Sequence, residues 1–468
     1  MLVISGHPVS SVDVGGWGYE GGQLSVDLSD LAARIEQDPR VARAHLDVVR
    51  PGDRTRVANI LDIFDARRKV DGPTFPGHDG PVETAGRGTL HRFSGLQIIG
   101  CARLPTGGGG VRVARRAFLD FWGEGVRWTP FGSTFSLVVE VEFAAGVEDQ
   151  LSADDAVRQA LITASTTVGA LGIESSDPDT PVETHHPFWG RQARTEVPRV
   201  AYVYQVQSHG PLLDTFLYGS PVAGLYPTLL DATEILDGAL VSGTRGRITT
   251  PTILHCNNPI VRRLADETRT EVNLLPVILM EGHHKTTEAK RRSAQHAVQL
   301  LRLLRADGAI FTQEGGGMSV VDQMLTIECA RQAEIECVAI TYEMAGAEGQ
   351  DRPLIYYKRA AKNLISTGNR DETIRLDAPG KLLGAHDQMA SPTSGRLTPA
   401  PAGAIASSAS TTPLTDRPAA SSEQSESVDL GGEVEVPVWC LYGSVSQVGA
   451  GRVRGHAASV GAARTSPT

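Results

Sequence analysis

Alternation of short apolar strands with amphipathic helices between residues 196 and 385 constrains the fold of this chain more than any other feature. The apolar runs of strand length are Val200–Val206, Val272–Met280, Gly308–Thr312, Cys337–Tyr342, Leu364–Thr367 and Thr373–Leu376. Apolar residues at helical spacing lie between them, over Thr287–Arg305 and Ser319–Glu334. Such alternation indicates a parallel sheet that helices cover on both faces. The sequence therefore predicts an α/β fold with a Rossmann-like parallel-sheet domain over residues 196–385.

The remainder of the chain divides by pattern into three further segments. Residues 1–146 carry apolar runs that Gly, Pro and Asp turns separate, which predicts a β-rich domain. Residues 147–195 contain apolar positions at helical spacing after Ser152, with Asp155 as its capping-box partner, and are predicted to form a helical linker. Residues 386–468 are rich in Ser, Thr, Pro and Ala, so they are predicted to form a mostly disordered, low-complexity tail.

Charge and cysteine content exclude several classes of protein. The formal net charge is -10, which argues against binding to a phosphate backbone, so no nucleic-acid partner is expected. The N-terminus has no signal-peptide pattern, and no window approaches the length of a membrane span, so a cytoplasmic protein without a membrane partner is expected. The five cysteines are scattered and form no C-x-x-C pair, which argues against a zinc ribbon or a redox motif.

Polar residues at the predicted strand ends are the candidates for chemistry. Ligands of parallel α/β sheets bind at the carboxyl ends of the strands. Gly308–Thr312 runs into Glu314, Gly315 and Gly316 and then into a helix, an arrangement that suits an anion or, with the carboxylate, an ammonium group. A tight turn without a ligand is the alternative interpretation of these glycines.

Two pairs of adjacent histidines also lie near strand ends. The strand Val272–Met280 runs through Glu281 and Gly282 into His283 and His284, and His185 stands next to His186. Adjacent side chains of an extended chain point to opposite sides, so neither pair is expected to ligate one ion. The sequence therefore predicts no metal site.

The densest polar cluster is His255, Cys256, Asn257 and Asn258, followed by Pro259. An imidazole beside a thiol can lower the pKa of the thiol and make it a nucleophile. The two asparagines before a proline are equally typical of a turn into a helix that begins near Ile260.

An ordered series of segments resembles the proprotein subunit of glycine/sarcosine/betaine reductase component B, with the D-proline reductase proprotein as a more distant relative. Segments that carry the resemblance include Val49–Asp53, Phe75–Gly77, Ser242-Gly243, His255 with Asn257–Pro259, Glu314-Gly315 and Asp322. The resemblance runs from near residue 10 to about Gly384.

The resemblance implies an oxidoreductase subunit that takes part in reductive C–N cleavage of a small amine or amino acid. Family members cut themselves at an internal cysteine, which becomes a pyruvoyl group that forms a Schiff base with the substrate. That cysteine lies shortly after the Ser-Gly pair that matches Ser242-Gly243. In this sequence the loop from Thr244 to Thr250 contains no cysteine, and Arg247 stands near the expected place. Thr249 or Thr250 offers a hydroxyl in place of the missing thiol, and Cys256 is a displaced thiol.

The sequence therefore leads to one favoured hypothesis and one alternative. The favoured function is a component-B-type reductase subunit, with Cys256, His255 and Glu314 as catalytic candidates and Asn257, Asn258, Gly315 and Gly316 as substrate-binding candidates. Its expected partners are a small amine substrate and a component B subunit that contains selenocysteine or cysteine, in an oligomer. No cofactor is assigned, because the pyruvoyl group of the family lacks its source here. The alternative is a non-catalytic binding or scaffold subunit that has lost the cofactor.

Overall fold

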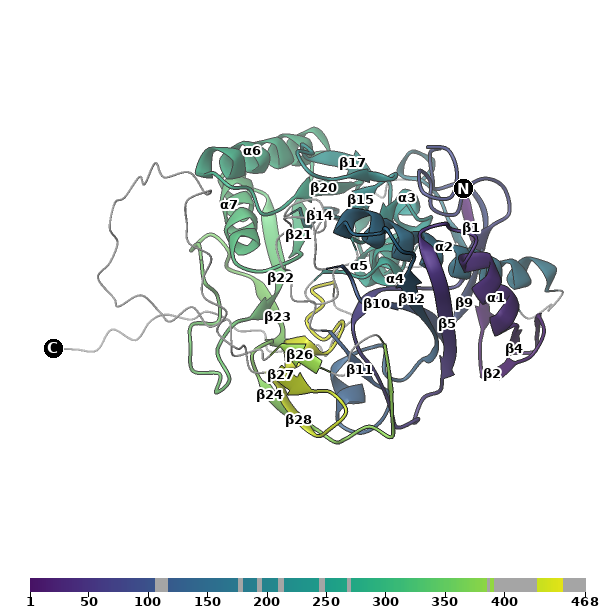
Figure 1. Cartoon of the computed structure of the whole chain (residues 1–468). Helices are drawn as coiled ribbons and strands as arrows, with labels where there is room; N and C mark the ends of the chain where they lie inside the picture. The colour runs from purple at the N-terminus through teal and green to yellow at the C-terminus, as the bar shows by residue number, and fades with distance from the viewer. Residues whose placement is uncertain are drawn as a thin grey trace.

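Strands dominate the N-terminal part of the chain (Figure 1). The computed structural model describes residues 1–105, 117–175, 180–191, 196–208, 214–243, 249–266, 271–384, 388–390 and 427–448. One sheet contains, in spatial order, β13 (Val182–His185), β1 (Leu2–Pro8), β9 (Gly88–Ser94) and β8 (Arg67–Lys69). A second contains β5 (Val41–Val49), β12 (Phe135–Phe143), β10 (Leu96–Ala102) and β7 (Ile60–Phe64). Two small sheets consist of β2 (Ser11–Val14), β4 (Gln23–Val26) and β3 (Gly18–Glu20), and of β11 (Leu119–Asp120), β6 (Thr55–Val57) and β25 (Lys381–Leu383).

Helix α2 (Gln150–Glu174) packs on these N-terminal strands, against β8, β9, β10 and β12. Its N-cap is Asp149, whose side chain accepts a hydrogen bond from the Ser152 backbone N–H. The helix therefore begins before Ser152, because an aspartate satisfies the free N–H groups of the first turn. Gly169 lets the helix approach closely, since a Cβ atom there would overlap the backbone of Arg67. The shorter helix α1 (Leu28–Ile35) is capped by Asp27 in the same way.

The predicted parallel sheet is present. Its strands lie in the order β17 (Thr228–Leu230), β20 (Val277–Glu281), β14 (Arg199–Val206), β21 (Gly308–Gln313), β22 (Glu336–Glu343) and β23 (Leu364–Asn369), with β19 (Asn273–Leu274) also paired to β14. All these pairings are parallel except that of β17, which lies antiparallel at the edge. The parallel strands follow the flavodoxin-like order rather than the Rossmann order, so the sequence-based prediction of a Rossmann-like sheet is met only in its parallel α/β character. Pro276 separates β19 from β20, where one continuous strand was predicted, because proline has no N–H for the ladder.

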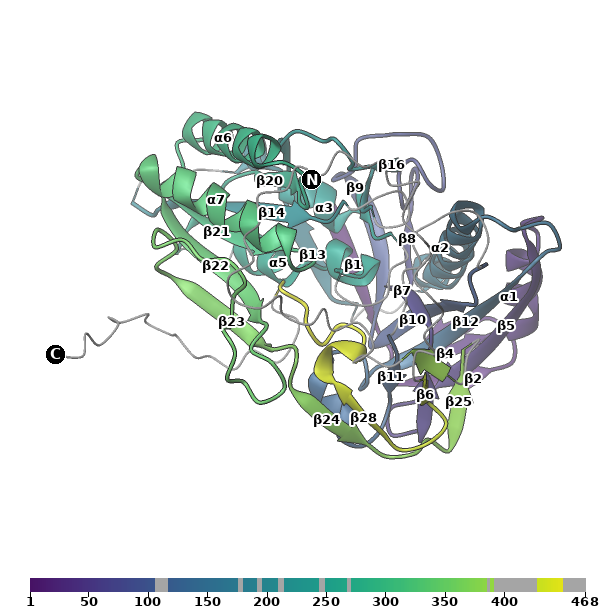
Figure 2. The same ribbon diagram turned by 60° about the vertical axis from the view of Figure 1, so that its left-hand side comes forward.

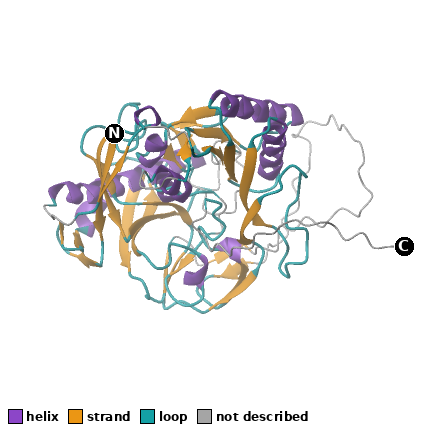
Figure 3. Ribbon diagram, turned by 180° about the vertical axis from the view of Figure 1, so that it is seen from behind, coloured by secondary structure: helices purple, strands orange, loops and turns teal. Residues whose placement is uncertain are grey.

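Helices cover both faces of this sheet (Figure 2). Ala201 and Val203 of β14 pack with residues of α6 (Thr287–Leu303) and α7 (Met318–Gln332). Tyr202 and Tyr204 point to the other face, toward the short helices α3 (Ala232–Leu236), α4 (Thr252–Cys256) and α5 (Pro259–Ala265). This second face also packs against the N-terminal sheets, since Leu2, Ile99 and Val138 belong to the same buried cluster as Tyr204. Seen from behind, strands and loops make up most of the body (Figure 3).

Residues 427–448 depart from the predicted disordered tail. β28 (Val434–Pro437) pairs antiparallel with β24 (Thr373–Leu376), and the one-turn helix η4 (Val438–Cys440) follows it. Val436 and Leu441 are fully buried. The buried Arg56 guanidinium donates to the carbonyls of Leu430 and Gly432 and forms an ion pair with Asp120. The prediction of a tail that joins no core therefore does not hold for this segment; residues 391–426 and 449–468 lie outside the described part of the chain.

The remaining short elements are β15 (Phe216–Leu217), β16 (Ser220–Pro221), β18 (Leu240–Val241), β26 (Gln388–Ala390), β27 (Ser427–Asp429), η1 (Gly125–Trp128) and η2 (Phe188–Gly190). Among the described residues, no helix has the length and apolar character needed to cross a membrane.

Candidate functional site

Glu314 lies at the carboxyl end of β21, and its side chain is almost fully buried. One carboxylate oxygen accepts hydrogen bonds from the Gln207 backbone N–H at 2.7 Å and the Thr215 hydroxyl at 3.1 Å. The other accepts the Thr250 backbone N–H at 2.9 Å. A buried carboxylate is tolerated when several donors surround it, so these bonds both stabilise the charge and fix the segments that supply them.

His255 on α4 contacts the same carboxylate. Its Nε2 atom lies 3.4 Å from Glu314 Oε1, and its Nδ1 atom lies 2.8 Å from the Tyr204 hydroxyl. Burial lowers the pKa of His255, and the Glu314 charge opposes this effect. Burial also raises the pKa of Tyr204 well above its ordinary value, so that hydroxyl stays protonated at neutral pH. His255 and Tyr204 thus share a buried hydrogen bond that is able to hold a proton, whereas His255 Nε2 has no hydrogen-bond partner among the described residues and faces Glu314 as an ionic contact.

Cys256 follows His255 on the helix but faces different surroundings. Its side chain belongs to the buried cluster that contains Leu61, Phe64 and Val241, and its thiol donates to the Leu240 carbonyl at 3.7 Å. Burial raises the pKa of Cys256 to about 12. The side chain is therefore a thiol at neutral pH, whereas a nucleophile needs the thiolate. The structure thus brings His255 and Glu314 together and directs Cys256 into the core.

Asn257 and Asn258 both make structural contacts. The Asn257 amide donates to Asp65 at 2.9 Å and to the Ile253 carbonyl at 2.8 Å, while its oxygen accepts from Arg92. The Asn258 side chain caps α5 by accepting the backbone N–H groups of residues 260 and 261. Asn258 thus acts in the helix-entry turn that was the alternative interpretation of this pair.

Gly315 and Gly316 allow close approach at the strand ends. Gly315 has φ of 73°, and a Cβ atom there would lie 2.6 Å from His283 Nε2. A Cβ atom on Gly316 would lie 2.5 Å from the Tyr342 hydroxyl. Any larger residue at either position would force apart the side chains that gather over this turn.

The adjacent histidines point in different directions. His283 Nε2 lies 3.3 Å from the Gln207 side-chain amide, whereas His284 Nδ1 lies 3.0 Å from the buried Asp322. Lys290 also pairs with Asp322, at 2.9 Å. Among the residues that the structure describes, no three or more His, Cys, Asp or Glu side chains are arranged to hold a metal ion.

Asp62 connects the N-terminal sheet to the site and was not among the site residues predicted from the sequence. This carboxylate is fully buried on β7 and accepts from the Thr252 backbone N–H at 2.9 Å and the Thr252 hydroxyl at 2.6 Å, at the start of α4. Burial raises the pKa of Asp62 to about 7, although the hydrogen bonds from Thr252 act to lower it. The available signal was a single aspartate inside the apolar run Ile60–Phe64.

Comparison with known proteins places the chain in a family. Residues 8–410 match the family described as glycine/sarcosine/betaine reductase component B subunits. The chain belongs to this family. It is 31% identical over 370 residues to the glycine reductase complex component B subunits alpha and beta of Peptoclostridium acidaminophilum, covering 78% of this chain and 84% of that protein. The sarcosine reductase complex component B subunit alpha of the same organism is 28% identical over 375 residues, 79% of this chain and 85% of the relative.

The betaine reductase complex component B subunit alpha of Peptoclostridium acidaminophilum is also 28% identical, over 383 residues that make up 80% of this chain and 85% of the relative. No solved structure matches the chain. The resemblance inferred from the ordered segments is thus confirmed for the family of component B subunits.

Proposed function

We propose that this chain is a subunit of a component-B-type reductase complex that reductively cleaves the C–N bond of a small amine or amino acid in the cytoplasm. A second component B subunit with a cysteine or selenocysteine would accept the carbon fragment. Membership of the component B family supports the proposal, and the relatives are named as subunits of glycine, sarcosine and betaine reductase complexes.

The contacts of the Glu314 carboxylate support the assignment of the proposed function to a particular site. This carboxylate binds the backbone N–H of Thr250, the last residue of the loop in which the family's cysteine is expected, and it contacts His255, which precedes the Asn-Asn-Pro segment. We assign Glu314 the role of positioning residue and assign the proton-holding role to His255 with Tyr204. In this proposal Gly315, Gly316, Asn257 and Asn258 shape the wall of the site.

The residues present do not fit the pyruvoyl group of the family. The loop from Thr244 to Thr250 contains no cysteine, and the nearby Cys256 is buried within α4 as a protonated thiol. No step through that group is therefore derived, and the chain is proposed to remain in one piece. Thr249 and Thr250 are the hydroxyl residues of this loop that the structure describes; Thr249 Oγ1 has no hydrogen-bond partner among the described residues, and the backbone N–H of Thr250 is held by Glu314.

Intact-mass measurement of the purified protein tests the absence of processing. One species near 49.8 kDa that does not react with a hydrazine carbonyl probe is expected. Two fragments that divide between Ser242 and Cys256, with a carbonyl at the new N-terminus of the second, would overturn it. A division directly before Thr249 or Thr250 would identify a threonine as the residue that replaces the cysteine.

A non-catalytic binding or scaffold subunit is the second candidate. Saturation of the Glu314 carboxylate by protein groups favours it, because that carboxylate has little capacity left for a substrate ammonium group. Two steps distinguish an enzyme subunit from a scaffold subunit. The chain is co-purified with its component B partner subunit, and the complex is then assayed for release of amine or ammonia from glycine, sarcosine and betaine. Release that Glu314→Gln abolishes supports the enzyme, whereas a stable complex without release supports the scaffold.

A further inference from the structure

The strands β21 and β22 separate before they reach their carboxyl ends. Their parallel ladder ends where Phe311 pairs with Ala339, whereas the ladder between β21 and β14 continues to the pair of Gln313 with Gln205. The Glu314 N–H donates to the Gln205 carbonyl of β14 at 2.9 Å. Because successive N–H groups of a strand point to opposite sides, the N–H of Gln313 faces the gap beside β22.

Gln447 of the C-terminal segment fills this gap. Its Oε1 atom accepts the Gln313 backbone N–H at 3.2 Å, in the place that a carbonyl of β22 would take in a continuous ladder. Gln447 is almost fully buried, and its Nε2 atom has no hydrogen-bond partner among the described residues. The contact with Gln313 is thus the one hydrogen bond that this amide makes within the described part of the chain.

The segment that carries Gln447 is anchored on both sides of this residue. The carbonyl of Tyr442 accepts the Thr129 hydroxyl at 2.7 Å. Val448 belongs to the buried cluster that contains Tyr204, whose hydroxyl binds the imidazole of the site. The chain next to Gln447 therefore lies on the same face of the sheet as the site, and contacts with the N-terminal region fix its place.

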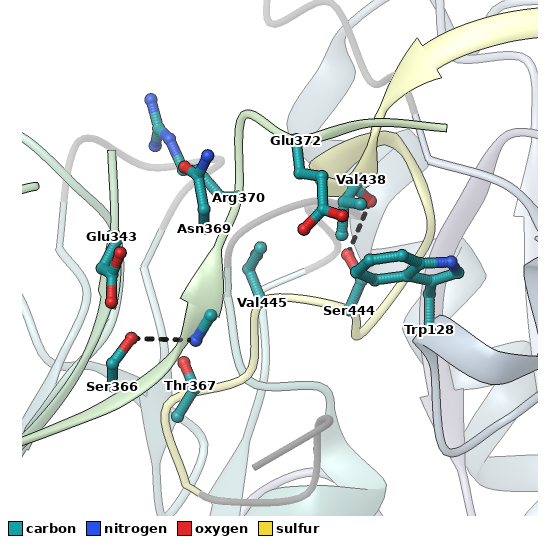
Figure 4. A pocket seen from close by; sticks show the side chains of 11 residues that line it. Trp128, Glu343, Ser366, Thr367, Asn369, Arg370, Glu372, Val438, Ser444 and Val445 are labelled. Atoms are coloured by element: carbon teal, nitrogen blue, oxygen red, sulfur yellow. Dashed lines mark hydrogen bonds between the residues drawn. The ribbon is translucent and has the colours of Figure 1, made fainter. Parts of the chain in front are cut away.

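The preceding residues of this segment border the neighbouring strand ends. Ser444 and Val445 line a cavity together with Glu343, the last residue of β22, and Thr367 of β23 (Figure 4). The Ser444 hydroxyl donates to the Val438 carbonyl at 2.7 Å, so it is engaged within the segment. The C-terminal segment thus runs along the carboxyl ends of the parallel strands, where proteins of this architecture bind their ligands.

We propose that Gln447 is a positioning residue of the reductase site, which it completes from outside the part of the chain that matches the family, residues 8–410. An unpaired strand end frays, so the bond from Gln447 fixes the backbone from which Glu314 projects. Glu314 in turn holds the N–H of Thr250 and contacts His255. This inference rests on the proposed function for its role in catalysis, whereas the placement of Glu314 is measurable without any activity.

Hydrogen–deuterium exchange of the full chain tests the contact. In the unaltered chain the Gln313 amide should exchange about as slowly as that of Phe311, which lies within the ladder. Gln447→Met removes the acceptor and keeps an unbranched side chain of similar length. In this variant the amides of Gln313 and Glu314 should exchange about tenfold faster or more, the scale of one lost hydrogen bond. Peptides from β24 and β28 should exchange as before, because the C-terminal segment stays packed.

Ser446→Ala provides the matched control. Ser446 is the neighbouring residue and is also buried, but its hydroxyl has no hydrogen-bond partner among the described residues. This variant should leave exchange at Gln313 and Glu314 unchanged. Fast exchange of the Gln313 amide in the unaltered chain would overturn the proposal without any variant, and so would equal exchange of Glu314 in Gln447→Met and Ser446→Ala.

The NMR signal of His255 distinguishes a positioning role from a purely structural one. With isotope-labelled histidine, the ring resonances of His255 are identified by their loss in His255→Gln. They should shift in Gln447→Met, because the Glu314 carboxylate no longer lies at 3.4 Å from Nε2, whereas the resonances of the exposed His45 should stay in place. An unmoved His255 signal in a variant with faster exchange at Gln313 would overturn the positioning role.

The co-purified complex supplies the catalytic readout. Gln447→Met should lower kcat for amine release and leave KM within about twofold, since the residue acts through Glu314 rather than on the substrate. An unchanged kcat would overturn the proposal. Absence of release from the unaltered complex would overturn the reductase function instead, and the exchange and NMR measurements would still decide whether Gln447 positions Glu314.

Discussion

His255 Nε2 and Glu314 Oε1 lie 3.4 Å apart in a site where both side chains are almost completely buried. The pair joins α4 to the carboxyl end of β21, and through Tyr204 it reaches the central strand β14. Because Glu314 also binds the backbone N–H groups of Gln207 and Thr250, one carboxylate organises the segments that follow β14 and precede α4. Loss of its charge should therefore affect stability as well as any chemistry.

Glu314→Gln should lower the free energy of unfolding by about 2 kcal/mol, the usual scale for a lost hydrogen bond to a charged group. The amide places an NH₂ group against the N–H of either Gln207 or Thr250, so one bond must break. Equilibrium urea unfolding measures the change. Glu433→Gln, at an exposed ion pair, is the control and should have little effect. Equal stability of the two variants would show that Glu314 does not hold these segments.

Cys256 should resist thiol reagents in the folded protein. Its pKa of about 12 and its burial leave almost no accessible thiolate at pH 8. Cys329, which is partly exposed, should react with iodoacetamide first. Peptide mass spectrometry after timed labelling gives both rates, and denatured protein supplies the reference in which both thiols react. Labelling of native Cys256 as fast as Cys329 would restore Cys256 as a nucleophile.

Asp62→Asn should change how stability depends on pH. Burial raises the pKa of Asp62 from 3.8 to about 7 in the folded chain, so folding takes up a proton between these values. The contribution of this group to stability therefore falls as pH rises through that interval, by at most about 1.4 kcal/mol per pH unit. Asparagine keeps an acceptor for the Thr252 N–H and a donor for its hydroxyl, as the protonated acid does.

The stability of the variant relative to the unaltered chain should thus rise from pH 4 to about pH 7 and stay level above pH 7. Thermal melts across this range provide the comparison, with Asp13→Asn at an exposed site as the control. A stability difference that is constant from pH 5 to pH 8 would mean that Asp62 is ionised throughout.

The spacing of apolar residues predicted those helices and strands whose buried face follows from their own sequence. Helices α6 and α7 begin and end within a few residues of the predicted ranges Thr287–Arg305 and Ser319–Glu334. Alternation along β14 places Ala201 and Val203 on one face and the two tyrosines on the other, because successive side chains of a strand point to opposite sides.

Contacts between distant segments left no comparable signal. β24 pairs with β28, which lies about sixty residues further along the chain, and no pattern in either strand indicates that the two would pair. The donors to Glu314 from Gln207 and Thr250 are backbone N–H groups, which every non-proline residue carries, so no residue type revealed them. The sequence located Glu314 and His255 as candidates, whereas the separation of Cys256 from them depended on which side of α4 faces the N-terminal core.

Removal of residues 427–448 should destabilise the chain, contrary to the expectation from composition. A chain that ends at residue 426 loses the β28 partner of β24 and the buried side chains of Val436 and Leu441, and it leaves the Arg56 guanidinium without two carbonyl acceptors. Each buried aliphatic side chain contributes about 1.5–3 kcal/mol, so a loss on the order of 5 kcal/mol is expected. Differential scanning calorimetry compares it with a chain that ends at residue 448, which keeps every described contact. Equal melting temperatures for the two truncated chains would show that the C-terminal segment does not pack on the body in solution.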